Sequence, residues 1–286
     1  MWIGLLFTLG AVVSMVLSET AKKKFNKDCP FFFAFICSLF ALIFFIFSSG
    51  FKFEFNKGIL VYSALFGLAY AIAIVFTIFA YKHGNFFTSG LVITYSLLLP
   101  TTYGILILKN ETSIFFFIGL ALLCIAIFLI FLRKKDPSVE KPKFNFLWLV
   151  LIVIAFIGNG FCNIFQTAEQ IAFDGMYKNE LMIVGLAIAT IVFLIFALIF
   201  DLKKIKDGFK PALLFGSISG LLNGALNLLI MYAVNILTAT IAFPLTYGGS
   251  LILTFVIARF IFKEKYTLLQ YIGFGVCLVS VVLLNL

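Results

Sequence analysis

Residues 235–286 read NILTATIAFPLTYGGSLILTFVIARFIFKEKYTLLQYIGFGVCLVSVVLLNL. This stretch holds two apolar segments, each long enough to cross a bilayer, joined by a short charged turn at 263–265. Neither segment has a charged residue at its centre. Because lipid cannot hydrogen-bond an exposed backbone, such segments cross a membrane as helices. The end of the chain is therefore predicted to form two consecutive transmembrane helices.

The same order of landmarks recurs in residues 83–131, in the first half of the chain. In both places a Thr-Tyr pair is followed by a Glu and then by an Ile-Gly pair. The matched landmarks are Thr94-Tyr95 with Thr246-Tyr247, Glu111 with Glu264, and Ile118-Gly119 with Ile272-Gly273. We interpret the chain as one unit that was duplicated.

The composition identifies an integral membrane protein. Hydrophobic residues make up 63% of the 286 residues and charged residues only 12%, which is too apolar for a soluble domain. The net charge of +9 would suggest a nucleic-acid partner in a soluble domain, but here the lysines lie in turns between apolar segments. Membrane orientation explains these lysines, so no nucleic-acid partner is predicted.

Ten segments are apolar and long enough to be membrane-spanning helices of about 20 residues. They are 2–18, 30–49, 59–81, 86–108, 113–132, 146–168, 176–200, 211–234, 237–262 and 267–285. The longest polar break, RKKDPSVEKPKFN at 133–145, contains two prolines and charges of both signs. This break predicts a basic linker between a first five-helix repeat, 1–132, and a second one, 146–286.

A repeat of five spans ends on the opposite side of the membrane from where it begins. The second copy therefore enters the membrane inverted relative to the first. The predicted fold is all-α and integral to the membrane, with ten transmembrane helices as two inverted five-helix repeats. Small residues in the third segment (Ala69, Ala73) and the eighth (Gly216, Gly220, Gly224) predict that these two helices are central and closely packed.

The basic residues predict how the chain is oriented. Seventeen of the 21 Lys and Arg residues follow the first, third, fifth, seventh and ninth segments, against four on the other side. Cytoplasmic loops carry the excess of basic residues, so the larger group is predicted to be cytoplasmic and both termini outside. Phe, Ile, Lys and Asn are abundant, as in AT-rich bacterial genomes, and we expect a multi-pass protein of the bacterial plasma membrane.

Two inverted halves of five spans, each closed by the Glu and Ile-Gly signature, resemble the drug/metabolite transporter superfamily, specifically its EamA-type members. The resemblance extends over essentially the whole chain. It implies that segments 3, 4, 8 and 9, with 1 and 6, surround a central substrate cavity. Substrates in that superfamily include amino acids, other metabolites, nucleotide sugars and organic cations.

Polar side chains follow one helix face in the sixth segment, and two more lie in the eighth. They are Asn159, Asn163, Gln166 and Gln170, and then Asn223 and Asn227. Such amides either link helices, each hydrogen bond contributing about 0.6 kcal/mol or somewhat more, or line a cavity. We predict that Asn159, Asn163, Gln166, Asn223 and Asn227 bind substrate. The matching positions of the first repeat are apolar, so the opposite walls of the cavity are predicted to be apolar or aromatic.

Four further residues, Tyr70, Tyr95, Thr246 and Tyr247, complete the predicted substrate-binding set. Tyr95 and Tyr247 recur in the repeat, and their hydroxyls or ring faces suit a polar or cationic ligand. Most other aromatic residues are expected to pack between helices or to lie at the membrane interface.

Proline and glycine interrupt the fourth and ninth segments near these tyrosines. Broken helices often border transporter sites, although membrane helices also tolerate such kinks. The predicted hinge or helix-break positions are Pro100, Pro244, Gly248 and Gly249.

All twelve acidic residues lie in loops or at the ends of segments. A proton-coupled exporter of cations needs a carboxylate within the membrane. The nearest candidates for coupling are the repeat partners Glu19 and Glu169, which alternatively cap their helices or pair with lysines at the interface. A neutral or zwitterionic solute, carried by a uniport-like or weakly coupled cycle, fits this interior better than a cationic drug.

The sequence offers nothing for catalysis or for a cofactor. Its one histidine, His83, lies in a turn, so neither a Ser/His pair nor a histidine-rich metal site is available. The five cysteines lack metal-ligand spacing, and no P-loop is present. We predict no enzyme activity, no metal and no cofactor.

The predicted function is secondary transport, by alternating access, of a small polar metabolite that is amino-acid-like, neutral or zwitterionic, or an amine. The predicted partners are this small molecule and membrane lipids, with the chain a monomer or a homodimer. Two alternatives stay open: a flippase for a lipid-linked metabolite, which a lateral opening between helices would favour, and a non-transporting subunit that binds lipid or a partner.

Overall fold

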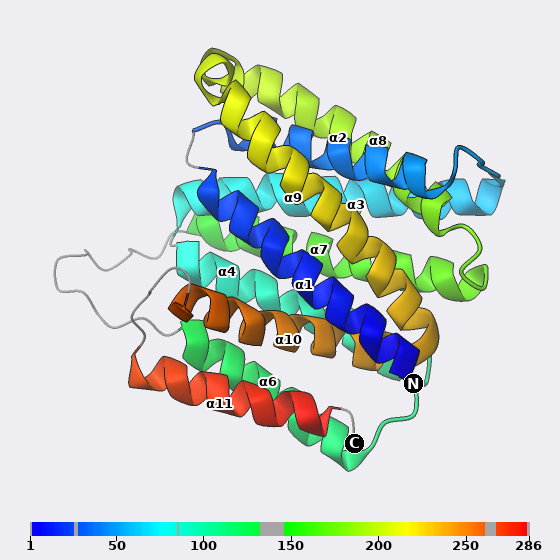
Figure 1. Cartoon of the computed structure of the whole chain (residues 1–286), viewed down its shortest axis with the longest axis vertical. Coiled ribbons are helices and arrows are strands. Elements are labelled where there is room, and N and C mark those ends of the chain that lie inside the picture. The colour runs from blue at the N-terminus through cyan, green and yellow to red at the C-terminus, as the bar shows by residue number, and fades with distance from the viewer. Residues whose placement is uncertain (1, 26–27, 85, 132–145, 261–266, 285–286) are drawn as a thin grey trace.

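A computed structural model of the chain describes residues 2–25, 28–84, 86–131, 146–260 and 267–284 (Figure 1). The predicted linker 133–145 and the charged turn 263–265, with Glu264, lie outside the described residues.

The described residues form helices joined by short connections, and they contain no strand. The helices before the linker are α1 (Trp2–Lys24), α2 (Pro30–Ser48), α3 (Lys57–His83), α4 (Phe86–Thr94), the 3-10 turn η1 (Tyr95–Leu97), α5 (Leu98–Leu106) and α6 (Ile114–Phe131). Those after it are α7 (Phe146–Ala172), α8 (Lys178–Phe196), the π-helical turn η2 (Ala197–Asp201), α9 (Leu202–Leu237), α10 (Ala239–Phe260) and α11 (Leu268–Leu283).

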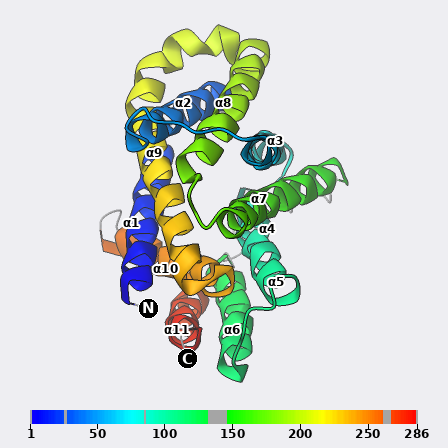
Figure 2. The same cartoon turned by 90° about the vertical axis from the view of Figure 1, so that its right-hand side faces the viewer.

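Within the described part of the chain, six helical stretches are long and apolar enough to cross a membrane, and three shorter apolar helices accompany them. One of the six, Lys178–Leu237, doubles back on itself. Figures 1 and 2 show an arched turn at η2 that connects α8 to α9, which returns in the opposite direction. This single stretch therefore contains two helices, α8 and α9, that run in opposite directions.

The helices of the two halves pack in matching pairs. α1 lies along α9, and α7 lies along α3. In the same way α2 packs against α9 and α8 packs against α3, while α2 contacts α8 and α6 contacts α11 (Figures 1 and 2). Each of the first three helices thus has a counterpart in the other half with the corresponding neighbours.

Small residues let these helices approach closely, as predicted for α3 and α9. A Cβ atom added at Gly220 of α9 would lie 2.3 Å from the carbonyl oxygen of Cys37 in α2. A Cβ atom at Gly158 of α7 would lie 2.9 Å from the backbone nitrogen of Ala73 in α3. Helices in lipid gain no hydrophobic free energy by associating, so close packing of their backbones holds them together instead.

Pro244 does not interrupt its helix. We predicted a hinge or break at Pro244, Gly248 and Gly249, but α10 continues through all three positions. Pro244 lies in the second turn of α10, where its missing N–H removes a single intrahelical hydrogen bond. The irregular position is instead η1 in the first half, immediately before α5, which contains Pro100.

The first turn of α2 is capped by a carboxylate from a distant part of the chain. Asp201, in η2, is 1% exposed, and its Oδ2 accepts the backbone N–H of Phe32 at 2.9 Å. The backbone N–H of Phe31 is also close to this carboxylate. A negative charge at a helix N-terminus satisfies free N–H groups and complements the helix dipole. Asp201 therefore fastens the α8–α9 turn to α2.

Replacing Asp201 with alanine is expected to lower the melting temperature of the detergent-solubilised protein by several degrees. The change leaves buried N–H groups of α2 without an acceptor, at a cost of about 1–3 kcal/mol each. Asp201→Asn keeps an acceptor oxygen and should retain a larger part of the stability. Equal melting temperatures for wild type and Asp201→Ala would show that this cap contributes nothing.

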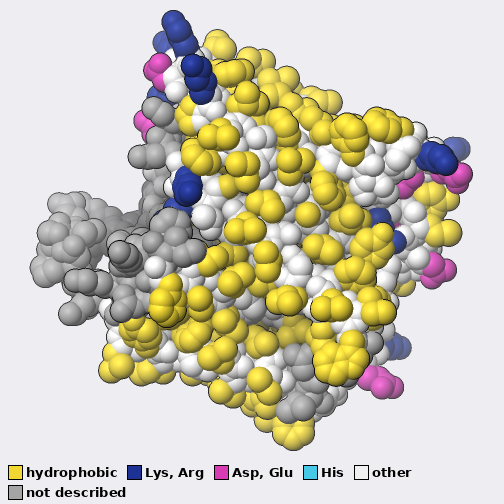
Figure 3. Space-filling model, in the orientation of Figure 1, with side chains coloured by type: hydrophobic (Ala, Val, Ile, Leu, Met, Phe, Trp, Pro, Cys, Tyr) yellow, Lys and Arg dark blue, Asp and Glu magenta, His cyan; other side chains and the backbone are white. Residues whose placement is uncertain are grey.

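The surface is that of a membrane protein. Large hydrophobic side chains are exposed along most helices, among them Leu6, Leu65, Ile157, Leu198 and Val279. Figure 3 shows hydrophobic side chains over the middle of one face and charged side chains gathered toward the two ends of the helices. Exposed apolar area of this extent belongs against lipid rather than water.

Candidate functional site

The amide stripe of α7 faces η1 of the first half. Asn159 Nδ2 donates to Ser96 Oγ at 2.6 Å, and Ser96 is fully buried. Asn163 lies one turn further along and donates through Nδ2 to the backbone oxygen of Asn159 at 3.2 Å. Both residues are only partly buried.

The next amide of the stripe bridges to α9. Gln166 Nε2 donates to Asn227 Oδ1 at 2.8 Å, and Asn227 Nδ2 donates to Asn223 Oδ1 at 3.1 Å and to its backbone oxygen at 2.8 Å. The structure therefore joins Gln166 of the α7 stripe to both predicted amides of α9. Gln166 is 2% exposed and acts as a link between helices, whereas Asn223 and Asn227 are half-buried.

Tyr247 of α10 approaches the amides of α7 from a third helix. Its hydroxyl lies close to the side chains of Asn163 and Asn159. Its neighbour Thr246 is fully buried and donates to Ala242 O of its own helix at 2.8 Å. Tyr247 thus belongs to the polar cluster, while the hydroxyl of Thr246 is occupied by its own helix.

Tyr95 and Tyr70 lie apart from these amides. The Tyr95 hydroxyl donates to the backbone oxygen of Cys124 in α6 at 2.7 Å, which directs it away from α7. Tyr70 stacks on Phe66 with ring centroids 6.0 Å apart and meets Phe193 edge-on. The repeat predicted equal roles for Tyr95 and Tyr247, but only Tyr247 contacts the amides.

Glu19 forms an ion pair with a lysine on its own helix. Lys22 Nζ lies 2.6 Å from Glu19 Oε1, and 37% and 56% of the two side chains are exposed, respectively. The ammonium of Lys22 is within electrostatic range of Cys37 in α2 and Tyr70 in α3. Lys22 is therefore close to two other helices and still reached by solvent.

Its repeat partner, Glu169, has a different environment. Glu169 is 0% exposed, and its Oε2 accepts a hydrogen bond from the side chain of Gln170. The other oxygen, Oε1, has no hydrogen-bond partner. The two candidate coupling residues are thus distinguished by structure, one open and paired, the other enclosed.

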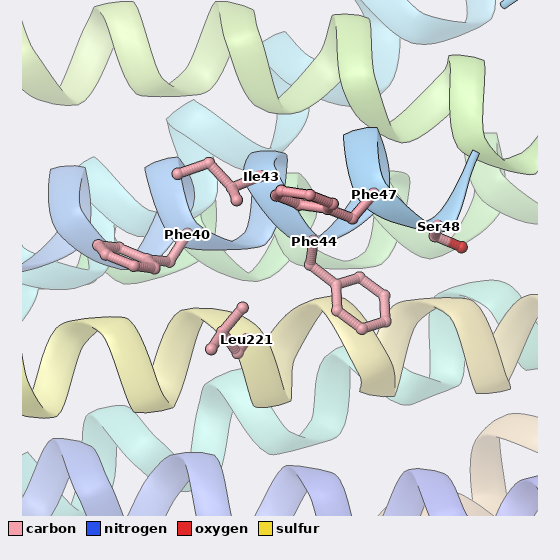
Figure 4. A pocket seen from close by; sticks show the side chains of 6 residues that line it. All are labelled: Phe40, Ile43, Phe44, Phe47, Ser48 and Leu221. Atoms are coloured by element: carbon pink, nitrogen blue, oxygen red, sulfur yellow. The ribbon is translucent and has the colours of Figure 1, made fainter. Parts of the chain in front are cut away.

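Two surface hollows are formed by described residues outside this cluster. The first, about 600 Å³, lies between α2 and α9 and is lined by Phe40, Ile43, Phe44, Phe47, Ser48 and Leu221 (Figure 4). The second, about 530 Å³, lies on the first turns of α9 at 205–211. Neither is lined by a predicted substrate-binding residue.

The described residues contain no group of three or more His, Cys, Asp and Glu side chains placed to hold a metal ion.

Comparison with known proteins identifies the family. The sequence model of the EamA-like transporter family matches residues 146–286. Through its second half, the chain belongs to the EamA-like transporter family. The resemblance to the drug/metabolite transporter superfamily is thereby confirmed. The family consists of membrane transporters and is not a family of enzymes.

Solved structures show that the fold of this EamA-type chain is shared by other proteins. One crystal structure, of a protein 12% identical in sequence, superposes with a TM-score of 0.75 over 99% of this chain and 98% of that chain. No curated protein matches the sequence. At this identity the structural likeness extends to the fold alone.

Two polar residues near the candidate site of this EamA-type chain, Lys22 and Ser96, were not predicted from the sequence. Lys22 was assigned to a cytoplasmic loop because the first segment was predicted to end at residue 18, whereas α1 continues to Lys24. The spacing of Glu19 and Lys22, three apart on a helix, was the available signal. Ser96 could not be found this way, because its role depends on where α7 lies.

Proposed function

We propose that this EamA-type chain is a secondary transporter of a small polar metabolite. The solute is neutral or zwitterionic and amino-acid-like, or an amine, and it crosses the bacterial plasma membrane by alternating access. The observation that carries the proposal is the polar cluster of Asn159, Asn163, Asn223, Asn227 and Tyr247. These neutral side chains remain partly accessible inside helices that are otherwise apolar, and polar groups placed so in membrane helices mark substrate pathways.

The architecture that we propose, ten spanning helices in two inverted halves, fits this mechanism. The matching helix pairs, α1 with α9 and α7 with α3, are the arrangement that inverted repeats produce. The family match begins at residue 146, where the second repeat was predicted to begin. In such transporters one bundle rocks against the other around a site near the middle of the membrane.

The chemistry of the cluster favours an uncharged or zwitterionic solute. Its amides and its tyrosine hydroxyl supply both donors and acceptors without net charge. The nearby ion pair of Glu19 and Lys22 adds one charge of each sign at an accessible place. A zwitterion can meet both charges, whereas a cation would gain Glu19 and face repulsion from Lys22.

The end of the molecule that carries Lys22, Lys23 and Lys24 is proposed to be cytoplasmic, with both termini outside. The last turn of α1 and the α8–α9 turn, with Lys203 and Lys204, share this end (Figure 1). Basic residues gather on the cytoplasmic side of membrane proteins.

A flippase for a lipid-linked metabolite is the second candidate function. The hollow between α2 and α9 favours it, because this hollow opens on the apolar side surface and is lined almost wholly by aromatic and aliphatic side chains (Figure 4). An acyl chain could occupy it while a polar head group entered between the helices.

A melting experiment tests the proposed function. The purified protein in detergent is heated with amino acids, polyamines, quaternary amines, nucleosides and sugars in turn. A ligand at 100 times its dissociation constant adds about 2.7 kcal/mol to the folded state, and the melting temperature rises. We expect one class to raise it for wild type and not for Asn163→Leu, which removes a donor from the cluster.

Ser217→Val is the control for this experiment. Ser217 is on α9, and its hydroxyl donates to Leu214 O of the same helix at 3.1 Å. This variant should keep the wild-type shift. If only added phospholipid raises the melting temperature of wild type, the flippase or the non-transporting lipid-binding subunit replaces the small-solute proposal.

A further inference from the structure

Glu169 lies in the last turn of α7, in a pocket of polar groups contributed by three elements. Gln170 Nε2 donates to Glu169 Oε2, and Gln170 Oε1 accepts from Asn235 Nδ2 of α9 at 3.0 Å. Glu169 Oε1 is completely enclosed and has no hydrogen-bond partner. A buried carboxylate is thus satisfied on one oxygen only.

The charged groups facing Glu169 do not neutralise it by direct contact. Lys178 and Glu180, both on α8, lie within electrostatic range. The ammonium of Lys178 donates to Gly175 O and lies 4.9 Å from the ring centroid of Tyr232 in α9. From α9 the neutral side chain of Asn235 completes the surroundings, and the aromatic rings of Phe173 and Tyr62 of α3 pack beyond the end of α7.

An ionised carboxylate in this pocket would be costly. A buried charge that lacks water and a full set of hydrogen bonds is disfavoured by several kcal/mol, and such a group becomes neutral instead. A proton needs a single oxygen, whereas a bound metal ion needs several oxygen ligands. One free oxygen therefore fits a proton better than it fits sodium.

We propose that Glu169 is the proton-binding residue that couples transport to a proton gradient. The inference rests on the proposed function and names its coupling ion. As the outer end closes, a hydronium ion of the external water gives its proton to Oε1: one O–H bond of hydronium breaks, an O–H bond forms at Oε1, and a water molecule is left. Later in the cycle the bond at Oε1 breaks and the proton passes to a water molecule that enters from the cytoplasmic side, so one proton crosses the membrane in each cycle.

The repeat partner Glu19 supports this assignment by contrast. Glu19 is exposed and paired with Lys22 at 2.6 Å, whereas Glu169 is enclosed and one of its oxygens has no partner. We therefore assign the proton to the enclosed member of the pair.

Infrared spectroscopy of the reconstituted full-length chain tests the proposal without a known ligand. Between about pH 6 and about pH 9, ordinary carboxyl groups are almost fully ionised. We expect wild type to show a carboxylic-acid C=O band that disappears as the pH rises. The intensity of this band should follow the titration of a single proton. Glu169→Gln, which mimics the protonated form, should fold and lack this band. Glu180→Gln and Glu19→Gln should keep it.

Identical spectra for wild type and Glu169→Gln over this pH range would overturn the proposal. So would a melting temperature that sodium raises in wild type but not in Glu169→Gln, because the bound ion would then be sodium. If Glu169→Gln keeps the ligand-induced melting shift while wild type shows no titrating band, the proposal of proton coupling is contradicted and the proposed transporter function is not. A titrating band without any ligand-induced shift would instead contradict the transporter function.

A ligand found in the melting experiment allows a second test, which measures how its dissociation constant depends on pH. With proton coupling, its dissociation constant in wild type should change by up to about tenfold per pH unit. In Glu169→Gln it should not change with pH, while the Glu180→Gln control should follow wild type. Equal pH dependence in wild type and Glu169→Gln would also overturn the proposal.

Discussion

Replacing Gly67 with valine is expected to prevent α3 from packing against α8 and to abolish monodisperse folded protein. A Cβ atom at Gly67 would lie 2.5 Å from the carbonyl oxygen and 2.9 Å from the Cα atom of Gly185. Both are backbone atoms of a long helix, so neither can move aside as the tip of a side chain can. Overpacking of a fixed contact costs about 1–3 kcal/mol and sometimes more, and here the two whole helices would have to separate.

Gly220→Val should have the same effect on the corresponding contact of the other half. Its Cβ atom would lie 2.3 Å from the carbonyl oxygen of Cys37 in α2. The measurement is size-exclusion chromatography of detergent extracts together with the melting temperature. Gly275→Val is the matched control, because nothing lies within 4 Å of a Cβ atom at Gly275. Wild-type elution and melting of Gly67→Val would show that α3 and α8 do not meet at this glycine.

The positions of the helices were predictable because hydropathy alone determines where a chain can cross lipid. The predicted segment 30–49 coincides with α2 to within one residue, and 146–168 lies inside α7. Helix ends were predicted less well. α1 continues six residues beyond the predicted end at residue 18 because charged side chains at a membrane surface remain helical when they pair, as Lys22 does with Glu19.

The amide cluster was predictable in part, since spacing places residues on one face of a helix but not against a neighbour. Asn159, Asn163 and Gln166 were selected together, and the structure shows that each has a different partner: Ser96, the α7 backbone and Asn227. Ser96 and Asn227 are distant from α7 in sequence, so periodicity carried no information about them.

Symmetry between the halves was informative for the architecture and misleading for side chains. Tyr95 and Tyr247 occupy matching places in the repeat, but the first-half helix changes to a 3-10 turn at Tyr95 while α10 continues through Tyr247. The local change of helix type turns Tyr95 toward Cys124 of α6. Repeat positions therefore share a place in the fold without sharing a contact.

The same asymmetry suggests which end of the transporter is closed in this conformation. At the end proposed to face outward, Thr167, Glu169 and Gln170 are at most 1% exposed. At the end proposed to be cytoplasmic, 56% of the Glu19 side chain is exposed. Under alternating access the two ends exchange these properties, so accessibility should depend on the side from which a reagent is added.

The test uses a chain whose five native cysteines are replaced by serine or alanine, with one cysteine placed at residue 19 or at residue 167. These two cysteines should react at very different rates. A membrane-impermeant thiol reagent is added from the cytoplasmic side for Glu19→Cys and from the outside for Thr167→Cys. We expect Glu19→Cys to react about tenfold or more faster. The reaction of Thr167→Cys is limited because the outward-open state is populated at about 10% or less. Thr167 donates to Asn163 O of its own helix at 2.9 Å, so its replacement disturbs no neighbouring element.

Thr20→Cys serves as the control for chemistry, because Thr20 also donates to its own helix, to Val16 O at 2.8 Å. A ligand that stabilises the outward-open state should raise the rate at Thr167→Cys and lower it at Glu19→Cys together, since one equilibrium governs both. Equal rates at the two positions, unchanged by ligand, would mean that the ends do not alternate. The chain would then be a membrane protein with an EamA fold that binds its polar ligand without carrying it.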